Sequence, residues 1–349
     1  MRIIRPLQIV VITIAALVAV VRWPADLVER YFARGVYPRL QGVLTAWSNQ
    51  TSVALFDFLA LVGGVVALAW IVRSVQLMRR RRSLGPLLGT AGNVATLGAL
   101  IYLWFIAAWG LNYARQPLES GLDYRSERVS AEAVRALALR AADEVNRLHA
   151  PGHAAGFPGA YEMPPSLVVA IHDVERRLGR PVPTVPSRPK RTLLGPFFRA
   201  AGVDGMHAPF LLETMLNPDL TPPERPAVLA HEWAHLAGYA PEDDASFVGL
   251  LAALKADPAM RYSAWLALFH EAIAILPGRD QQELVARLEP GPMEDRAAIA
   301  RRQQARVEVV SRASWETYDR YLKTQGVPEG VQSYSRVVQL LLGTGALDW

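Results

Sequence analysis

Apolar residues are concentrated near the N-terminal end of the chain, in three long runs that contain few charged positions. The runs cover residues 3–23, 52–72 and 84–111. Each run reaches the roughly 20 residues that an α-helix needs to cross a bilayer. The pattern therefore predicts a membrane domain over residues 1–113 with three transmembrane helices, followed by a second domain over residues 114–349.

Beyond residue 113, apolar and charged residues follow helical spacing in several segments that proline-rich stretches interrupt. Ser130 is a suitable N-cap for a helix that continues to about residue 149. Further helices are expected over the following segments: 261–276, 281–288 and 293–323. Residues 166–171 and 210–217 have the composition of β-strands. We therefore expect a mainly α (α+β) fold, in which a mostly helical soluble domain contains a small sheet.

The distribution of basic residues predicts how the helices cross the membrane. The connection between the second and third apolar runs carries five arginines: Arg73, Arg79, Arg80, Arg81 and Arg82. Because short connections rich in Lys and Arg stay in the cytoplasm, three crossings place the second domain on the opposite side. We therefore predict a multi-pass protein of the bacterial inner membrane, with its soluble domain on the periplasmic or extracellular side.

Composition adds three limits to this interpretation. The net charge of +5 and the arginine cluster need no nucleic-acid partner, because membrane topology accounts for them. Asp57 lies near one end of the second run and is expected to reach the interface, so we assign it no role. The chain has no cysteine, which excludes disulfides and thiolate ligands. Any metal site must therefore be built from nitrogen and oxygen donors.

The stretch His-Glu-Trp-Ala-His at residues 231–235 carries the clearest chemical signal. Residues four apart share one face of a helix, so His231 and His235 can bind a single ion at roughly 2.0–2.1 Å each. Glu232 points to the side, where it can take a proton from a metal-bound water without displacing either histidine. The pattern predicts a zinc hydrolase; the alternative is a pair of hydrogen-bonded core histidines on an ordinary amphipathic helix.

A turn and a second helix follow the motif. Gly238 is placed to end the first helix, and Pro241 is suited to the beginning of the next. The second helix begins with three acids at 242–244, which can also act as plain N-terminal caps because acids stabilise that end of a helix. A catalytic zinc site needs three protein ligands and an open position, so one of these acids is a candidate third ligand.

The face on which each acid lies favours Glu242 as that ligand. Its face continues through three small residues, Ala245, Ser246 and Gly249, which would let the second helix approach the first closely. Asp244 instead heads an apolar face typical of a core. We therefore predict Glu242 as the third ligand and keep Asp244 as the substitute.

Other residues are candidates for stabilising a tetrahedral intermediate or for lining the cleft. Suitable hydrogen-bond donors occur at Tyr239, Tyr334 and Arg336. We assign Tyr334 a catalytic role. For Tyr334 and Arg336, the alternative is that they pack at the start of a helix. His207 could line the cleft, although a solitary loop histidine is more often structural.

Four blocks occur in an order that resembles a bacterial membrane family named domain of unknown function 3810. They lie at 31–38, at 112–118, in the motif region and at 333–338. The resemblance covers nearly the whole chain. It implies three N-terminal spans and a zincin-like domain, and the family name leaves its substrate open.

Members of that family read His-Glu-x-Ala-His-Gln-x-Gly-Phe-Ala-x-Glu-x-Glu-Ala-Asn-Phe through the motif region. Here Leu236 replaces the Gln, Asp244 the second Glu and Ser246 the Asn. The kept acid, Glu242, is therefore favoured over Asp244 as the ligand. The second helix also resembles that of gluzincin peptidases, which implies that Ser246 supports a histidine.

These observations predict a membrane-anchored zinc metallopeptidase whose partners are the lipid bilayer and a peptide or protein substrate, with Zn²⁺ as cofactor. Residues 210–217 lie where zincins place the edge strand that pairs with an extended substrate, and an ordinary core strand is the alternative. Two other functions stay open: a catalytically silent membrane-tethered zinc scaffold, and a zinc amidase acting on cell-wall peptide. Retention of Glu232 argues against the scaffold, because a structural site has no use for that acid.

Overall fold

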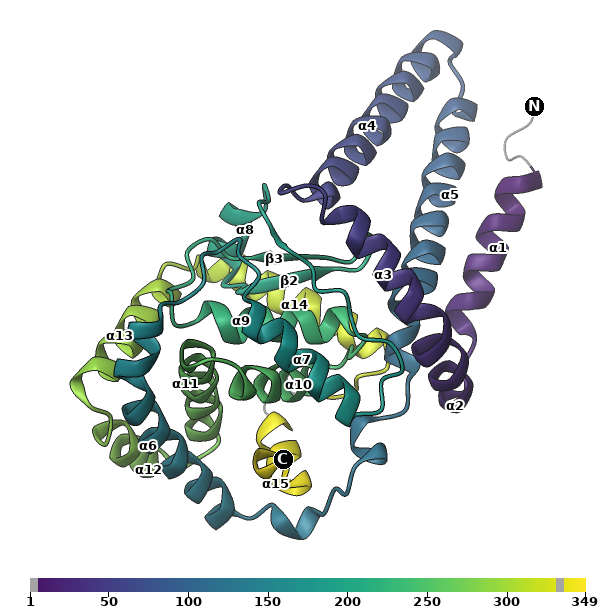
Figure 1. Cartoon of the computed structure of the whole chain (residues 1–349). Coiled ribbons are helices and arrows are strands. Elements are labelled where there is room, and N and C mark those ends of the chain that lie inside the picture. Colours follow the sequence, from purple (N-terminus) through teal and green to yellow (C-terminus); the bar gives the residue numbers. More distant parts are fainter. Residues whose placement is uncertain (1–5, 331–335) are drawn as a thin grey trace.

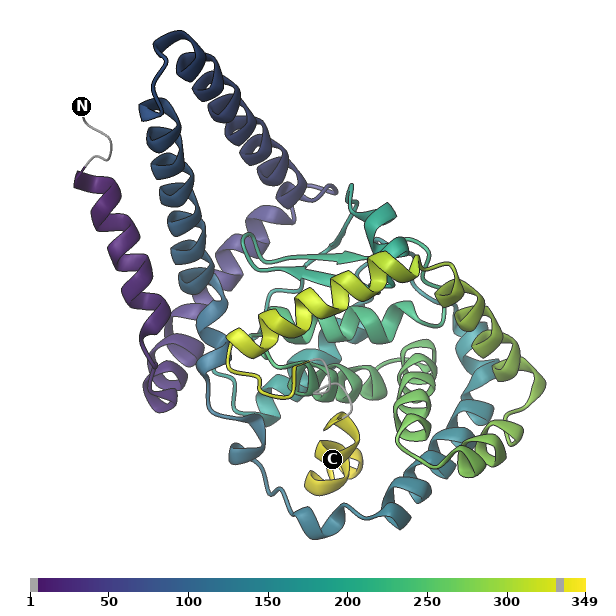
Figure 2. The same ribbon diagram turned by 180° about the vertical axis from the view of Figure 1, so that it is seen from behind.

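The computed structural model describes residues 6–330 and 336–349 (Figure 1). Most of these residues are helical, and three short strands form one mixed sheet. The apolar N-terminal helices project from one side of the remaining chain, as Figures 1 and 2 show from opposite directions. The expected combination of a mainly helical protein with a small sheet is therefore confirmed.

Two helices are long and apolar enough to cross a membrane: α4 (Leu55–Arg81) and α5 (Gly85–Ala108). They correspond to the second and third predicted spans. The first predicted span corresponds to α1 (Pro6–Val20), which has 15 described residues. After α1 the chain bends by 108° into the helical segment Ala25–Ser48. The described residues therefore contain two helices that are long and apolar enough to span a membrane, or three if the bent pair is one span.

The segment between α1 and α4 packs against the rest of the chain. It contains α2 (Ala25–Leu27), a π-helical stretch (Val28–Val36) and α3 (Tyr37–Ser48). A backbone bridge joins Val53 to Arg191, and the backbone N–H of Ala54 donates to the carbonyl of Arg191 at 2.8 Å. The division of the chain at residue 113 stays a prediction, but this segment contacts residues well beyond it.

The chain after residue 113, the predicted soluble part, is built mainly from α-helices. Ser130 caps the first of them, because its Oγ accepts from the N–H of Ala133 at 3.1 Å, as predicted. The helices are α6 (Ala131–Ala155), α7 (Pro165–Arg177), α8 (Gly195–Ala201), α9 (Arg225–Leu236), α10 (Glu242–Lys255), α11 (Pro258–Ala274), α12 (Gly278–Ala286), α13 (Pro290–Gln304), α14 (Glu308–Thr324) and α15 (Val337–Thr344). Short 3-10 turns occur at Gly110–Ala114, Leu118–Gly121, Ser126–Arg128 and Ala346–Asp348.

Two expectations about secondary structure are wrong. Residues 166–171 lie in α7 rather than in a strand, because the buried positions of this helix, among them Leu167, Ile171 and Val174, recur every three or four residues. The long helix expected over 293–323 is divided into α13 and α14. The break lies at residues 305–307, where the N–H of Val307 donates to the carbonyl of Ala200 instead of continuing a helix.

The sheet has the order β1-β3-β2, with β3 parallel to β1 and antiparallel to β2. Its strands are β1 (Pro189–Lys190), β2 (Gly205–Ala208) and β3 (Glu213–Leu216). The predicted strand at 210–217 thus exists as β3, but it is central and buried. Its expected role as the edge strand is wrong, and among the described strands β2 has a free edge on the side away from β3.

The motif helix α9 occupies the centre of the soluble part, between the sheet and α10 (Figure 1). Trp233 anchors it there. Its side chain is completely buried, and its Nε1–H donates to the carbonyl of Ser187 at 2.9 Å. On the side that Figure 2 shows, α14 crosses the molecule as a yellow-green helix.

Candidate metal centre

The turn between α9 and α10 brings the predicted residues together. Gly238 has a φ of +88°, which favours glycine, and its N–H donates to the carbonyl of His235 at 2.8 Å. A side chain at Gly238 would also collide with Tyr37 and Asn112, each 2.9 Å from a Cβ placed there. The predicted end of the first helix at this glycine is therefore confirmed, and α10 returns alongside α9.

Three side chains converge between these two helices. Glu242 Oε2 lies 3.2 Å from His231 Nε2 and 3.3 Å from His235 Nε2. One donor atom from each residue falls within 4.8 Å of the other two. Ligands about 2.0–2.1 Å from a tetrahedral ion are separated from each other by about 3.3 Å. The two measured separations therefore match those of ligands that share one zinc ion.

Hydrogen bonds orient both imidazole rings toward that common point. His235 Nδ1 lies 2.8 Å from the carbonyl oxygen of Tyr239, and His231 Nδ1 lies 3.1 Å from Ser246 Oγ. A carbonyl can only accept, so His235 carries a proton on Nδ1, and its neutral form has the lone pair on Nε2. Such partners are typical of histidine ligands in metal sites. The contact between Ser246 and a motif histidine agrees with the resemblance described above.

Glu242 is held in place through its other carboxylate oxygen. Tyr318 of α14 donates its hydroxyl to Oε1, while Oε2 is buried and faces the Nε2 atoms of the two imidazoles. A buried carboxylate oxygen in this position needs either a proton on one of the rings or a bound cation to compensate its charge. The donor set therefore fits a divalent ion. Tyr318 was not predicted from the sequence, because it follows Glu242 by 76 residues and belongs to no motif.

The charges of this cluster are strongly coupled. Burial alone would raise the pKa of Glu242, but the neighbouring His235 and His231 hold it well below its ordinary value. Burial lowers the pKa of His235, and Glu242 and Glu232 override this effect and raise it to about 9. Burial and the adjacent His235 lower the pKa of His231. A proton on His235 thus occupies the position that a cation would take.

Glu232 projects from α9 toward strand β2. A Cβ at Gly205 would lie 2.5 Å from Glu232 Oε1, so a larger residue there would force this carboxyl group to move. Burial raises the pKa of Glu232 to about 8, and the charge of His235 acts in the opposite direction. A carboxyl group with a pKa near neutrality is suited to accept and return a proton.

A cavity of about 270 Å³ opens beside the cluster. His231, Glu232 and Ser246 line one part of it. Trp315 of α14 and Glu271 of α11 line other parts. The cavity thus borders the predicted base and one of the two motif histidines.

Comparison with known protein families identifies the chain. The model described as "Protein of unknown function (DUF3810)" matches residues 32–342. The chain belongs to this family. The resemblance inferred from the four sequence blocks is therefore confirmed, and the family description assigns no activity. No curated protein and no solved structure matches the chain.

In this DUF3810 chain, Asp244 lies away from the three converging donors. It lines a second cavity together with Arg115, Tyr239 and Arg336. Burial and the adjacent Asp243 raise the pKa of Asp244 to about 8, which neighbouring arginines only partly oppose. Because it shares no donor geometry with the histidines, the structure does not support Asp244 as the substitute ligand.

Two of the predicted oxyanion donors, Tyr239 and Arg336, do not join the donor cluster. The Tyr239 ring packs against Arg115, whose guanidinium carbon is 5.2 Å from the ring centroid. Arg336 forms ion pairs with Glu119 at 3.2 Å and with Asp243 at 3.4 Å. Tyr334 lies outside the described residues, so its catalytic role stays a prediction.

His207 on β2 is buried next to the site rather than exposed in a loop. Neither ring nitrogen has a hydrogen-bond partner in the described part of the chain, and the ring lies 5.2 Å from that of Trp109. Burial, with the charge of His235, holds its pKa well below the ordinary value. His207 is therefore a neutral group in the wall of the site.

Side chains from the N-terminal part cap the end of the motif helix. Tyr37 donates its hydroxyl to the carbonyl of Leu236 at 2.7 Å, and Trp109 Nε1–H donates to the carbonyl of His235 at 3.1 Å. Both carbonyls belong to the last turn of α9, where carbonyl groups lack i+4 partners within the helix; the His235 carbonyl also accepts from the N–H of Gly238. These N-terminal segments thus help to position the motif helix α9.

Proposed function

We propose that this chain is a membrane-anchored, zinc-dependent peptidase with a zincin-like soluble domain. The observation that carries the proposal is the convergence of His231, His235 and Glu242, with separations suited to a single tetrahedral ion. His231, His235 and Glu242 would hold the ion. When bound, zinc would supply Lewis acidity and lower the pKa of a water molecule.

The chain's own groups have separate tasks in this mechanism. Glu232 takes a proton from the attacking water and later returns it to the leaving amine, for which its raised pKa is suited. Tyr318 fixes the orientation of Glu242 through its hydroxyl. The Nδ1 partners of the two histidines keep both Nε2 atoms directed at the ion.

Strand β2 is the best candidate for substrate recognition. It lies beside Glu232 and, in the described sheet, pairs only with β3. An extended peptide could add to its free edge through main-chain hydrogen bonds, a mode that tolerates many side chains. The cavity lined by Val203, Asp204 and Trp315 would then receive a side chain of that peptide.

The proposed location is the bacterial inner membrane, with the soluble part on the periplasmic or extracellular side. The arginine-rich turn between α4 and α5 lies at the far end of these helices from the soluble part (Figure 1). Because such turns stay in the cytoplasm, the candidate metal centre would face the other compartment.

The test is Glu232→Gln in the full chain, reconstituted with zinc and assayed with a fluorogenic peptide library. We expect unchanged zinc content, because Glu232 is not among the three donors, and a loss of hydrolysis by about 10²–10⁴-fold, because the general base is removed. Glu283→Gln is the matched control, since Glu283 lies on α12 and pairs with Arg135 at 2.8 Å.

Equal peptide hydrolysis in wild type and Glu232→Gln would refute the proposed mechanism. Zinc binding without hydrolysis of any peptide in the wild-type protein would favour the membrane-tethered scaffold. Hydrolysis of cell-wall peptides, but not of protein-derived peptides, would favour the amidase.

A further inference from the structure

Helix α3 has its polar face turned toward the protein. Its completely buried side chains include four that carry hydroxyl or amide groups, Tyr37, Gln41, Thr45 and Ser48. They recur at intervals of three or four residues and therefore form one stripe. A helix on the surface of a water-soluble protein normally buries its apolar face instead. The orientation of α3 is thus the reverse of the usual one.

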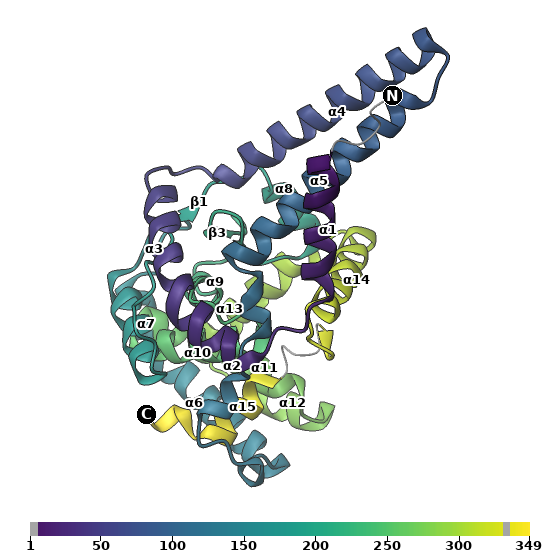
Figure 3. The ribbon, with the colours of Figure 1, turned by 90° about the vertical axis from the view of Figure 1, so that its right-hand side faces the viewer.

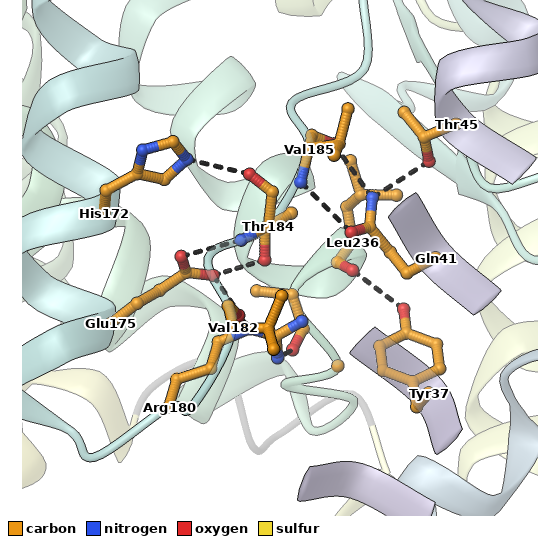
Figure 4. A network of polar contacts seen from close by, with 12 residues as sticks. Tyr37, Gln41, Thr45, His172, Glu175, Arg180, Val182, Thr184, Val185 and Leu236 are labelled. Carbon is orange, nitrogen blue, oxygen red and sulfur yellow. Dashed lines mark hydrogen bonds and ion pairs between the residues drawn. The ribbon is translucent and has the colours of Figure 1, made fainter. Parts of the chain in front are cut away.

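Specific hydrogen bonds fix this orientation (Figure 4). The Gln41 amide donates to the carbonyl of Val185 at 2.8 Å and accepts from its N–H at 3.1 Å. Thr45 donates to the carbonyl of Leu212 at 3.1 Å. With the bond from Tyr37 to Leu236, these contacts anchor α3 to three separate segments of the soluble part. The helix therefore cannot rotate to bury its other face without losing them.

The outer face of α3 is apolar. Val36, directly before the helix, is 58% exposed, Val43 is 68% exposed and Trp47 is 52% exposed. Their spacing of seven and four residues places them on one stripe. Arg39, on the same helix, is also exposed. An exposed apolar stripe with a tryptophan and flanking arginines is typical of helices that lie in a membrane interface.

The direction of α3 relative to the apolar helices agrees with such a position. The axis turns by 108° between α1 and the segment that contains α3, so the two are nearly perpendicular. Helix α1 packs along α5, and Gln8 donates to Asn93 at 2.8 Å between them. Figure 1 shows α3 running from the lower end of α4 toward that of α1, and Figure 3 shows it steeply inclined to α4 and α5. If α5 crosses the bilayer, α3 lies nearly parallel to its surface.

A second apolar patch occurs at the foot of α4. Leu193 is 76% exposed and Phe197 is 44% exposed. Asp57, in the first turn of α4, accepts from the N–H of Leu193 at 2.7 Å and from Thr192 Oγ1 at 2.9 Å. These bonds fix the patch at the point where α4 leaves the soluble part. They also give Asp57 a structural role that the sequence did not indicate.

We propose that the outer stripe of α3 and the patch at Leu193 and Phe197 are embedded in the interfacial layer of the bilayer. The soluble part then rests on the membrane surface. The bilayer is the expected occupant because both surfaces are continuous with the ends of apolar helices long enough to span it. Trp47 suits the headgroup region, and Arg39 can meet lipid phosphates.

The absence of native cysteine allows a direct test. Val43→Cys and Phe197→Cys would be labelled with a nitroxide in the full chain, reconstituted in nanodiscs of phosphatidylethanolamine and phosphatidylglycerol. Relaxation by oxygen, which concentrates in lipid, is compared with relaxation by a water-soluble nickel chelate. Val65→Cys on the exposed face of α4 is the lipid reference, and Arg176→Cys on α7 is the water reference.

We expect the ratio of oxygen to nickel accessibility at Val43 and Phe197 to exceed that at Arg176 several-fold. A ratio equal to that at Arg176 would overturn the proposal. Protection from both reagents together with spin–spin broadening would also overturn it, because a second copy of the chain would then cover the face. The measurement needs neither zinc nor turnover, so its outcome is independent of the proposed peptidase function.

Discussion

Gly249 lets α10 pack directly on the backbone of the motif helix. A Cβ at this position would lie 2.7 Å from the His231 nitrogen, 2.8 Å from the Ala230 carbonyl carbon and 2.9 Å from the Ala230 carbonyl oxygen. All three are main-chain atoms, so no side-chain rotation can relieve the contact. Gly249→Ala must therefore separate the two helices that carry the candidate ligands.

The size of the displacement follows from these distances. Ordinary contacts of a Cβ begin at 3.4 Å, so the closest pair must separate by about 0.7 Å. Overpacking of this kind costs about 1–3 kcal/mol of folding stability. Metal–ligand distances vary by only about 0.2 Å within a given kind of site. A displacement of about 0.7 Å between the helices that carry Glu242 and the two histidines exceeds that range. We expect zinc affinity to fall at least about tenfold, equivalent to about 1.4 kcal/mol.

The assay is zinc competition with a chromogenic chelator on the full chain, together with chemical unfolding of the metal-free protein. Gly278→Ala is the matched control, because Gly278 is also a helical glycine but has no atom within 4 Å of the added Cβ. The control should retain both affinity and stability. If folded Gly249→Ala binds zinc as tightly as wild type, the close approach of α10 does not set the ligand geometry.

Three further predictions concern the same region. The pKa of His235 is raised to about 9, and its proton must leave when zinc binds, so the zinc affinity should rise about tenfold per pH unit from pH 7 to about pH 9 and then level off. Calorimetry in buffers of different ionisation enthalpy should detect one released proton. A zinc affinity that does not change with pH would show that His235 releases no proton on binding. Ser246→Ala removes the partner of His231 Nδ1 and should weaken zinc binding by about 10- to 100-fold, with Ser314→Ala on α14 as the control. Tyr37→Phe leaves a buried carbonyl of α9 without its donor and should lower the free energy of unfolding by about 1–3 kcal/mol, whereas Tyr31→Phe, at an exposed position, should not.

Short-range patterns predicted the central part of the site. One helix-turn-helix contains the two motif histidines, the glycine after the motif helix and the small residues of α10. These features can therefore be interpreted without knowledge of the fold. The choice of Glu242 over Asp244 as the candidate ligand rested on the same local reasoning about helix faces. The geometry agrees with it, since only Glu242 approaches both imidazoles.

Groups supplied by distant segments could not be predicted in this way. Tyr318 approaches Glu242 only because α14 crosses the site, and the sequence did not indicate that a break after residue 304 would redirect the chain.

The error at residues 166–171 has a related origin. A short apolar run with β-branched residues fits a strand or a buried helix equally well, and tertiary packing selected the helix.

The N-terminal segments also contribute to the framework of the candidate site. The carbonyls of His235, Leu236 and Gly238 accept hydrogen bonds from Trp109, Tyr37 and Arg115, respectively, and all three donors precede residue 116. A fragment beginning at residue 114 would lack the first two donors and leave the buried Leu236 carbonyl at the end of α9 without the hydroxyl of Tyr37, whereas the His235 carbonyl would keep the N–H of Gly238. Since this helix end lies next to a candidate ligand, we expect the conformation of the N-terminal segments to affect the geometry of the candidate metal centre. Measurements of metal binding therefore need the full chain.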